Sequence, residues 1–210
     1  MPGARGDEGP LESVAHPLPA DGWADDAFAG LDDRLRAVLV GPGLGPVDAS
    51  ALALAASVER PMVFDGDALQ SELVGLLAGR TAPTVLTPHD GEWQRLGGAD
   101  SADRIAATRA FAVEHQLTVV RKGPTTIVAS PDGIAHIVTA GTAALATAGT
   151  GDVLAGAIVG LLARGHDALT AATIAAHVHG ASGAELGEGL VASEVADRLP
   201  VVLARLRDLR

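Results

Sequence analysis

Cysteine and tyrosine do not occur in this chain of 210 residues, and only three phenylalanines and two tryptophans are present. Without cysteine the chain has no disulfide, no thiolate zinc site and no cysteine nucleophile. With so few aromatic rings, the core must be packed from Ala, Val, Leu and Ile. Because 48% of the residues are hydrophobic, the chain can still bury a sizeable core, which excludes wholesale disorder.

Positive charge is also scarce, since 15 Lys and Arg stand against 26 Asp and Glu and give a formal net charge of −11. A protein that binds duplex nucleic acid needs a basic face that displaces phosphate counterions, so nucleic acid is not expected as a partner. A small anionic nucleotide can still bind where backbone N–H groups and a few cations converge.

Long apolar runs are absent too, because every stretch of 18 residues contains polar breaks, and no membrane partner is expected. The charged, Gly/Pro-rich start of the sequence does not resemble a signal peptide. Together with the absence of cysteine, this start predicts a cytoplasmic protein.

The chain divides into an irregular lead-in, residues 1–34, and one α/β domain, residues 35–210. Four prolines and several acidic residues keep the lead-in irregular, although its pattern allows a short strand around residues 13–16. In the remainder, strands alternate with helices, which predicts a mostly parallel central sheet with helices on both faces. Pro131-Asp132-Gly133 makes a tight turn between the last two strands, which should pair as a late antiparallel hairpin.

The apolar runs and their flanking Gly, Pro and Asp residues set the expected elements. Strands are expected at 37–40, 61–65, 84–87, 117–123, 125–130 and 134–139. Helices are expected at 48–60, 68–78, 92–96, 103–116, 152–163, 168–186 and 193–209. The last helix should kink or break near Pro200, because proline lacks the N–H that a helix interior needs.

A glycine-rich segment, TAGTGDVLAG at 147–156, directly precedes the most apolar helix. Gly149 and Gly151 allow the backbone to take positive φ values and to approach a ligand closely. The first-turn N–H groups carry the positive end of the helix dipole, so Gly149, Thr150 and Gly151 form a candidate anion hole for a phosphoryl group. Asp152 is then a candidate base for a hydroxyl proton, and the competing interpretation is a simple N-cap.

Polar loops follow four successive predicted strands at their carboxyl ends, where open α/β sheets bind ligands. These loops are GPGLG at 41–45, DGD at 65–67, TPHDGE at 87–92 and KG at 122–123. Each loop alone is more often a turn or a cap, but the topology brings all four to one rim.

Elsewhere, His177 and His179 have no carboxylate at ligand spacing, so we interpret them as packing or capping residues and predict no metal ligands among the histidines.

The segments GPGLG, FDGDAL, LTPHDGE, RKGPTTIV, ATAGTGDVLAG and AAHVHGASG, in this order and spacing, resemble the ADP-dependent NAD(P)H-hydrate dehydratases, a family with the ribokinase-like fold. The resemblance extends from about Val38 to the C-terminus. It implies a hydro-lyase that dehydrates the hydrated nicotinamide ring of damaged NADH or NADPH while ADP is converted to AMP and phosphate. It further implies use of Mg²⁺ and a homo-oligomer.

Carried over position by position, the resemblance makes Asp152 the catalytic base and a contact of the substrate. It places Gly45 and His89 against the hydrated dinucleotide, Gly151 at AMP, and Glu92 near a hydrated Mg²⁺ ion. The other residues of the implied AMP site are Lys122, Gly123, Pro124, Thr125 and Thr126.

The resemblance also has departures. The family's first strand–helix region, with a Gly/Ala-rich stretch that contacts the substrate, is expected to be absent here. Asp65-Gly66-Asp67 stands where the family has Asp-Ala-Asp, and Thr142 stands near the place of an asparagine.

Two other functions stay open: a ribokinase-like kinase acting on another small-molecule hydroxyl, and a nucleotide-binding remnant without catalysis.

Overall fold

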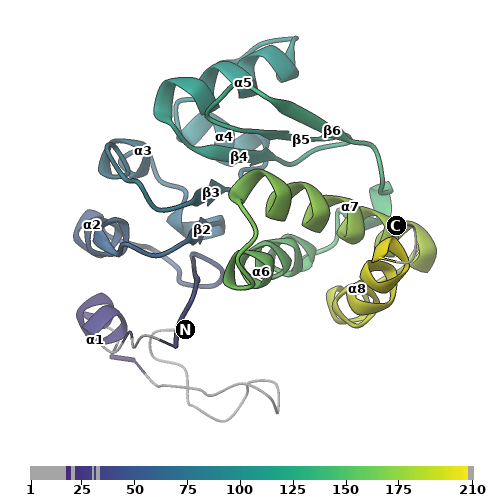
Figure 1. Cartoon of the computed structure of the whole chain (residues 1–210), viewed down its shortest axis with the longest axis horizontal. Coiled ribbons are helices and arrows are strands. Elements are labelled where there is room, and N and C mark those ends of the chain that lie inside the picture. Colours follow the sequence, from purple (N-terminus) through teal and green to yellow (C-terminus); the bar gives the residue numbers. More distant parts are fainter. Residues whose placement is uncertain (1–17, 20–21, 30, 32–33, 208–210) are drawn as a thin grey trace.

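A computed structural model describes residues 18–207 except 20, 21, 30, 32 and 33, and a six-stranded sheet lies at its centre (Figure 1). Its strands, side by side in chain order, are β1 (Val38–Val40), β2 (Met62–Phe64), β3 (Thr84–Leu86), β4 (Thr118–Arg121), β5 (Thr126–Ala129) and β6 (Ala135–Val138). The first four pair in parallel, whereas β4–β5 and β5–β6 pair antiparallel. The predicted parallel sheet with a late hairpin is therefore confirmed.

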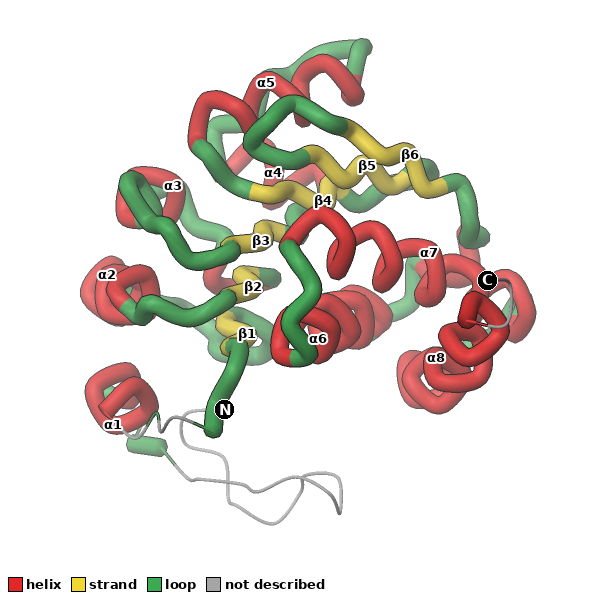
Figure 2. The backbone as a smooth tube through the Cα atoms, viewed as in Figure 1, coloured by secondary structure: helices red, strands yellow, loops and turns green. Residues whose placement is uncertain are grey.

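Helices cover both faces of this sheet (Figure 2). One face carries α2 (Ala49–Ser57), α3 (Leu73–Leu76), α4 (Asp90–Arg95) and α5 (Arg104–His115), and the opposite face carries α6 (Thr150–Ala163) and α7 (Ala168–Leu186). The last helix, α8 (Ala192–Arg207), packs on α6 and α7 away from the sheet. Two 3₁₀ helices, η1 (Gly66–Ala68) and η2 (Ala143–Leu145), complete the described elements apart from α1, discussed below. Within the described part of the chain, no helix combines the length and apolar character needed to cross a membrane.

The strands contribute side chains to two separate hydrophobic cores, because successive side chains of a strand point to opposite faces of the sheet. Met62 and Phe64 of β2 join the core under α2–α5, whereas Val63 between them joins the core under α6 and α7. Val119 and Val120 of β4 divide in the same way. A sheet that is buried on both faces explains why its strands read as continuous apolar runs.

The predicted helix at 68–78 is wrong. The chain forms η1 at 66–68 and then only the four-residue α3, because Leu69 has a non-helical ψ of 69°. Asp67 is held by two contacts there: its carboxylate accepts the N–H of Gly45, and its carbonyl accepts from the Gln70 side chain. Contacts with a neighbouring loop therefore override the local helical pattern.

The lead-in is not irregular throughout, because it contains the helix α1 (Trp23–Ala29). Its first turn carries Asp25 and Asp26, which favour a helix N-terminus, and Ala24 and Phe28 pack inward beside α2. The strand allowed around 13–16 lies outside the described residues. Of the kink or break expected near Pro200, a break does not occur, since α8 continues through this residue.

Gly41, directly after β1, should tolerate no side chain. Its φ is +132°, and a Cβ there would lie 1.6 Å from the carbonyl oxygen of Asp65. We expect Gly41→Ala to lower the free energy of unfolding by about 2–5 kcal/mol, from backbone strain and overpacking together. The matched control is Gly160→Ala, inside α6 with open space around it, which should raise that free energy by roughly 0.5–1 kcal/mol. Urea denaturation measures both; equal stabilities for the two variants would contradict the close approach.

Candidate functional site

An ion pair between Asp65 and Lys122 lies at the carboxyl edge of the parallel strands. Asp65 follows β2, Thr87 follows β3 and Lys122 follows β4, so the sheet pairing brings these three residues together. Asp65, only 2% exposed, accepts at one oxygen from the Thr87 hydroxyl at 2.7 Å and from the Lys122 ammonium at 2.8 Å. A buried carboxylate with these two donors holds the ammonium in one place.

The neighbouring loops are joined to the same edge. Asp67 accepts the N–H of Gly45 at 2.8 Å, which fixes the loop after β1 against the loop after β2. On the other side, the Lys122 N–H donates to the Pro88 carbonyl at 2.8 Å, and its ammonium lies 3.6 Å from Glu92. The four loops that the sequence predicted to share one rim are therefore brought together.

His89 caps the helix α4. Its Nδ1 accepts the N–H of Gly91 at 3.0 Å, while the Glu92 carboxylate accepts the N–H of His89 at 2.7 Å, which is a capping box. The imidazole remains largely exposed, with 57% of its side chain accessible at the rim. The capping role that sequence reasoning considered for His89 is thus present, and the ring is also available to a ligand.

The glycine-rich segment forms the start of α6. Gly149 is the N-cap in the left-handed region, with φ +85°, and it offers no side-chain cap. Asp152 is consequently the third residue of the helix, so the interpretation of Asp152 as a simple N-cap is wrong. A Cβ built on Gly151 would lie 3.5 Å from the Lys122 ammonium. First-turn amides and a lysine cation therefore converge on one point, as an anion site requires.

The Asp152 carboxyl group has a raised pKa. Desolvation by the surrounding protein is the largest cause, repulsion from the Asp65 carboxylate is the next, and Asp67 adds to it. The Lys122 ammonium acts in the opposite direction without cancelling these effects. Asp152 therefore holds a proton more tightly than an ordinary aspartate, a property suited to a general base.

A cavity of about 670 Å³ opens beside Lys122, within the size range of small-molecule sites. The predicted residues among those that line it are His89, Lys122, Gly123, Pro124, Thr126, Thr150 and Gly151. Gly45, Gly149 and Asp152 are not among its lining residues. Lys122 thus lines the cavity, pairs with Asp65, and acts electrostatically on the Asp152 carboxyl group.

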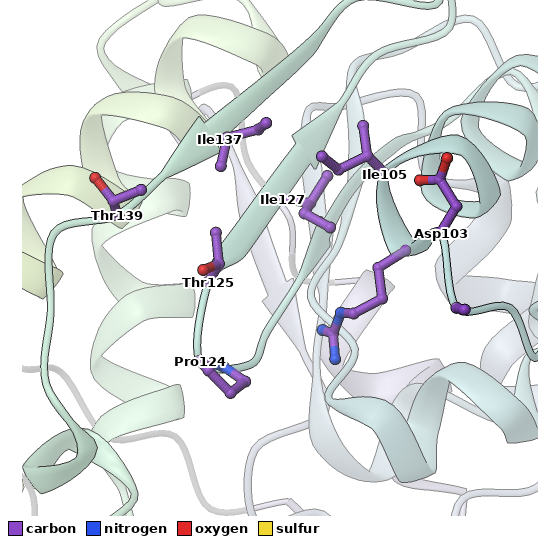
Figure 3. A pocket seen from close by; sticks show the side chains of 9 residues that line it. Asp103, Ile105, Pro124, Thr125, Ile127, Ile137 and Thr139 are labelled. Atoms are coloured by element: carbon purple, nitrogen blue, oxygen red, sulfur yellow. The ribbon is translucent and has the colours of Figure 1, made fainter.

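Thr125 is the one residue of the implied AMP site that does not line the cavity beside Lys122, although its neighbour Pro124 lines both this cavity and the groove next to it. Thr125 lines that open groove together with Ile105, Ile127 and Ile137 (Figure 3). The reason is strand alternation, because Thr126, the next residue, faces the cavity beside Lys122.

A hydrogen-bond network next to the Lys122–Gly123 segment, which Asp90, Arg104 and Arg121 form, was not predicted from the sequence. Asp90 accepts hydrogen bonds from Arg121 at 3.0 Å and from Arg104 at 2.7 Å, and Arg104 also donates to the Lys122 carbonyl at 3.0 Å. Burial acts to raise the pKa of Asp90, but both arginines outweigh it and hold that pKa below its ordinary value. Asp90 was expected only as part of the loop 87–92, because the predicted helix begins at residue 92, whereas α4 begins at Asp90.

His179 was also missed, because it was interpreted as a packing or capping residue. It is 8% exposed, lines the cavity, and its Nε2 lies 2.9 Å from the Thr150 carbonyl oxygen. Burial lowers the pKa of His179, the Thr150 hydrogen bond opposes this, and the Lys122 charge lowers it further. The imidazole is therefore neutral near pH 7, and its Nε2–H donates to the carbonyl.

Comparison with known proteins identifies a family. Residues 9–200 match the family model described as NAD(P)H-hydrate dehydratase, a range that includes most of the lead-in. A bifunctional NAD(P)H-hydrate repair enzyme from Salinibacter ruber is 41% identical over 208 residues, which cover 90% of this chain and 38% of the relative. The chain thus spans well under half the length of this curated relative.

Solved structures agree in fold. An ADP/ATP-dependent NAD(P)H-hydrate dehydratase from Bacillus subtilis, co-crystallised with ATP and Mg²⁺ and soaked with coenzyme A, superposes with a TM-score of 0.77 at 32% identity. The match covers 91% of this chain and 74% of that one. A ribokinase-like superfamily protein from Enterococcus faecalis gives a TM-score of 0.68 at 28% identity, covering 81% and 63%. The expected ribokinase-like fold is confirmed.

Removal of the Asp65 charge should lower the pKa of Asp152. In Asp65→Asn one repulsive carboxylate is lost, and the Lys122 ammonium is no longer neutralised by it, so both changes favour ionised Asp152. An NMR titration of the Asp152 carboxyl carbon measures the shift. Asp132→Asn, in the turn between β5 and β6, serves as the control and should leave Asp152 unchanged. An identical Asp152 titration in all three proteins would contradict the coupling.

Proposed function

The chain belongs to the NAD(P)H-hydrate dehydratase family, and on that basis we propose that it dehydrates hydrated NADH or NADPH in an ADP-dependent reaction that releases AMP and phosphate. The observation that carries the proposal is the position of Lys122. Lys122 lines a cavity of about 670 Å³, its ammonium lies beside Gly151, and its charge acts on the Asp152 carboxyl group. A cation in this position would neutralise a phosphoryl group as it passes from a bound nucleotide to an acceptor.

The proposed reaction has two stages. Asp152 takes the proton of the hydrate hydroxyl, whose oxygen bonds to the β-phosphorus of ADP as the bond to AMP breaks. The ring C–O bond then breaks with loss of a proton from the adjacent carbon, which releases phosphate and restores the dihydronicotinamide. Phosphoryl transfer depends mainly on positioning and charge neutralisation, and the Lys122 ammonium and the amides at the start of α6 supply both.

The two ligands would meet at Lys122. Gly123, Pro124, Thr126 and Gly151 line the cavity and would hold the adenylate, whereas Gly45 and Asp152 would face the hydrated dinucleotide. We assign Thr125 no side-chain contact with the adenylate, because its side chain lines the separate groove.

A magnesium ion fits this site only through the nucleotide. Among the described residues no group of three or more His, Asp or Glu side chains could hold a metal. That agrees with the behaviour of Mg²⁺, which keeps several waters and binds to phosphates with one or two carboxylates. Glu92 already accepts the N–H of His89, so it would face the ion through water, and the bound ion would neutralise phosphate charge.

We extend the proposal to a homo-oligomer. Ile134 and Ile137, in the turn before β6 and on this edge strand, are 46% and 49% exposed, and the groove in Figure 3 lies beside Ile137. Exposed apolar surface of this kind favours association between copies.

Purified protein, incubated with hydrated NADH, ADP and Mg²⁺, should restore the absorbance of the reduced nicotinamide with one AMP formed per ring repaired. ADP or AMP binding without turnover would reject the dehydratase and favour the non-catalytic remnant. Phosphorylation of another small alcohol, without repair, would favour the kinase.

Asp152→Asn should lose at least ~10²–10³-fold in turnover, the range seen when one preorganised group of a transition-state site is removed. The variant should fold normally. Because the folded protein raises the pKa of Asp152, ionising this carboxyl destabilises the fold as pH rises, so the Asn variant should keep an equal or higher Tm at pH 7. Steady-state rates and thermal unfolding check both statements. Wild-type turnover in this variant would remove Asp152 from the mechanism.

A further inference from the structure

We propose that His179 is a positioning residue that aims the N–H of Gly151 at the transferred phosphoryl group, through the peptide that joins Thr150 to Gly151. The inference rests on the proposed function, since it assigns a role inside the same anion hole. His179 belongs to α7, whereas the anion hole belongs to α6, and the contact between them is the 2.9 Å hydrogen bond from Nε2 to the Thr150 carbonyl oxygen.

A single peptide unit links the hydrogen bond that His179 donates with the N–H of Gly151. The carbonyl of Thr150 and the N–H of Gly151 belong to the same planar group and point in opposite directions. A donor on the carbonyl therefore fixes the direction of the N–H, and it also polarises the peptide so that the N–H becomes a stronger donor. Gly151 lines the cavity and lies beside the Lys122 ammonium, so its N–H is at the place where phosphoryl charge would develop.

The side chain of Thr150 is also held in place, by contacts of its hydroxyl with two carbonyl oxygens. Its hydroxyl donates to the Leu145 carbonyl at 2.6 Å and lies 2.8 Å from the Thr147 carbonyl. These contacts keep the buried Thr150 next to His179, and a turn of the Thr150–Gly151 peptide plane would break the hydrogen bond from His179. The orientation of the Gly151 N–H is thus set by contacts that do not involve the ligand, which is the meaning of a preorganised site.

The helix α7 comes close enough for this contact because Gly180 follows His179. A Cβ on Gly180 would lie 2.1 Å from the Ala140 carbonyl oxygen, so any larger residue would push α7 away from the segment that leads into α6. The neutral state of the buried imidazole leaves Nε2–H as the donor to Thr150.

The test compares His179→Leu with His179→Gln. Glutamine carries an N–H donor the same number of bonds from the backbone as Nε2, whereas leucine fills similar space without a donor. We expect His179→Leu to lower kcat by roughly 10-fold with little change in KM for ADP, less than the ~10²–10³-fold loss that follows removal of an oxyanion donor itself. His179→Gln should recover most of that loss.

A second measurement does not depend on turnover. The Gly151 amide proton, followed by NMR in the ¹⁵N-labelled protein, should shift upfield in His179→Leu relative to His179→Gln, since both variants lack the aromatic ring and differ in the donor. His177→Leu is the matched control: His177 is exposed two residues earlier on α7, and its loss should change neither kcat nor the Gly151 resonance.

The outcomes separate the two proposals. Equal kcat in wild type and His179→Leu, or equal impairment of the Leu and Gln variants with the same Gly151 resonance, would overturn the role of His179. Absence of turnover in the wild type would reject the proposed function, while the Gly151 resonance would still decide the orientation of the peptide. If His179→Leu does not fold, His179→Asn replaces it, because asparagine is too short to reach Thr150.

Discussion

The ion pair between Asp65 and Lys122 is the contact on which the site depends. A charge buried at the edge of an apolar sheet costs several kcal/mol unless it is paired, so these two residues and Thr87 bind the carboxyl ends of three strands to one another. The same carboxylate has two further effects, because it holds the ammonium beside Gly151 and it raises the pKa of Asp152. The buried Asp65 carboxylate therefore both joins the strand ends and influences the proton affinity of Asp152.

Much of the fold could be predicted because its signals are local. The buried strand β2 is an apolar run, and β4 contains the β-branched residues Thr118, Val119 and Val120. The helices α2, α5 and α7 each begin directly after an aspartate that caps them. The failures arose where distant contacts override local preference. The segment after β2 uses its residues to contact the loop after β1, and α1 forms because Phe28 packs inward. No local pattern records such contacts.

The functional site, like the fold, could be predicted where its signals are local but not where it depends on contacts between distant segments. The sequence indicated which loops meet at the rim, because strand ends and glycine patterns are visible in it, and the order of the residues predicted the family. Strand alternation separates Thr125 from Thr126, but the sequence could not indicate which of the two faces the cavity beside Lys122, since that depends on what packs on each face of the hairpin. Nor could it separate His179 from His177, because the difference between a buried and an exposed histidine is decided by how α7 lies on α6.

The order of elements along the chain has a consequence for synthesis on the ribosome. The strands β1 to β6 are neighbours in the order in which they emerge, so the sheet can assemble progressively as translation proceeds. Among the described elements, α6 and α7 cover its second face, with Val63, Val85 and Val120, and both come after the last strand. At ~5–20 residues per second, that face stays bare on the nascent chain for on the order of ten seconds. During this interval the nascent chain exposes an apolar surface that includes these three valines.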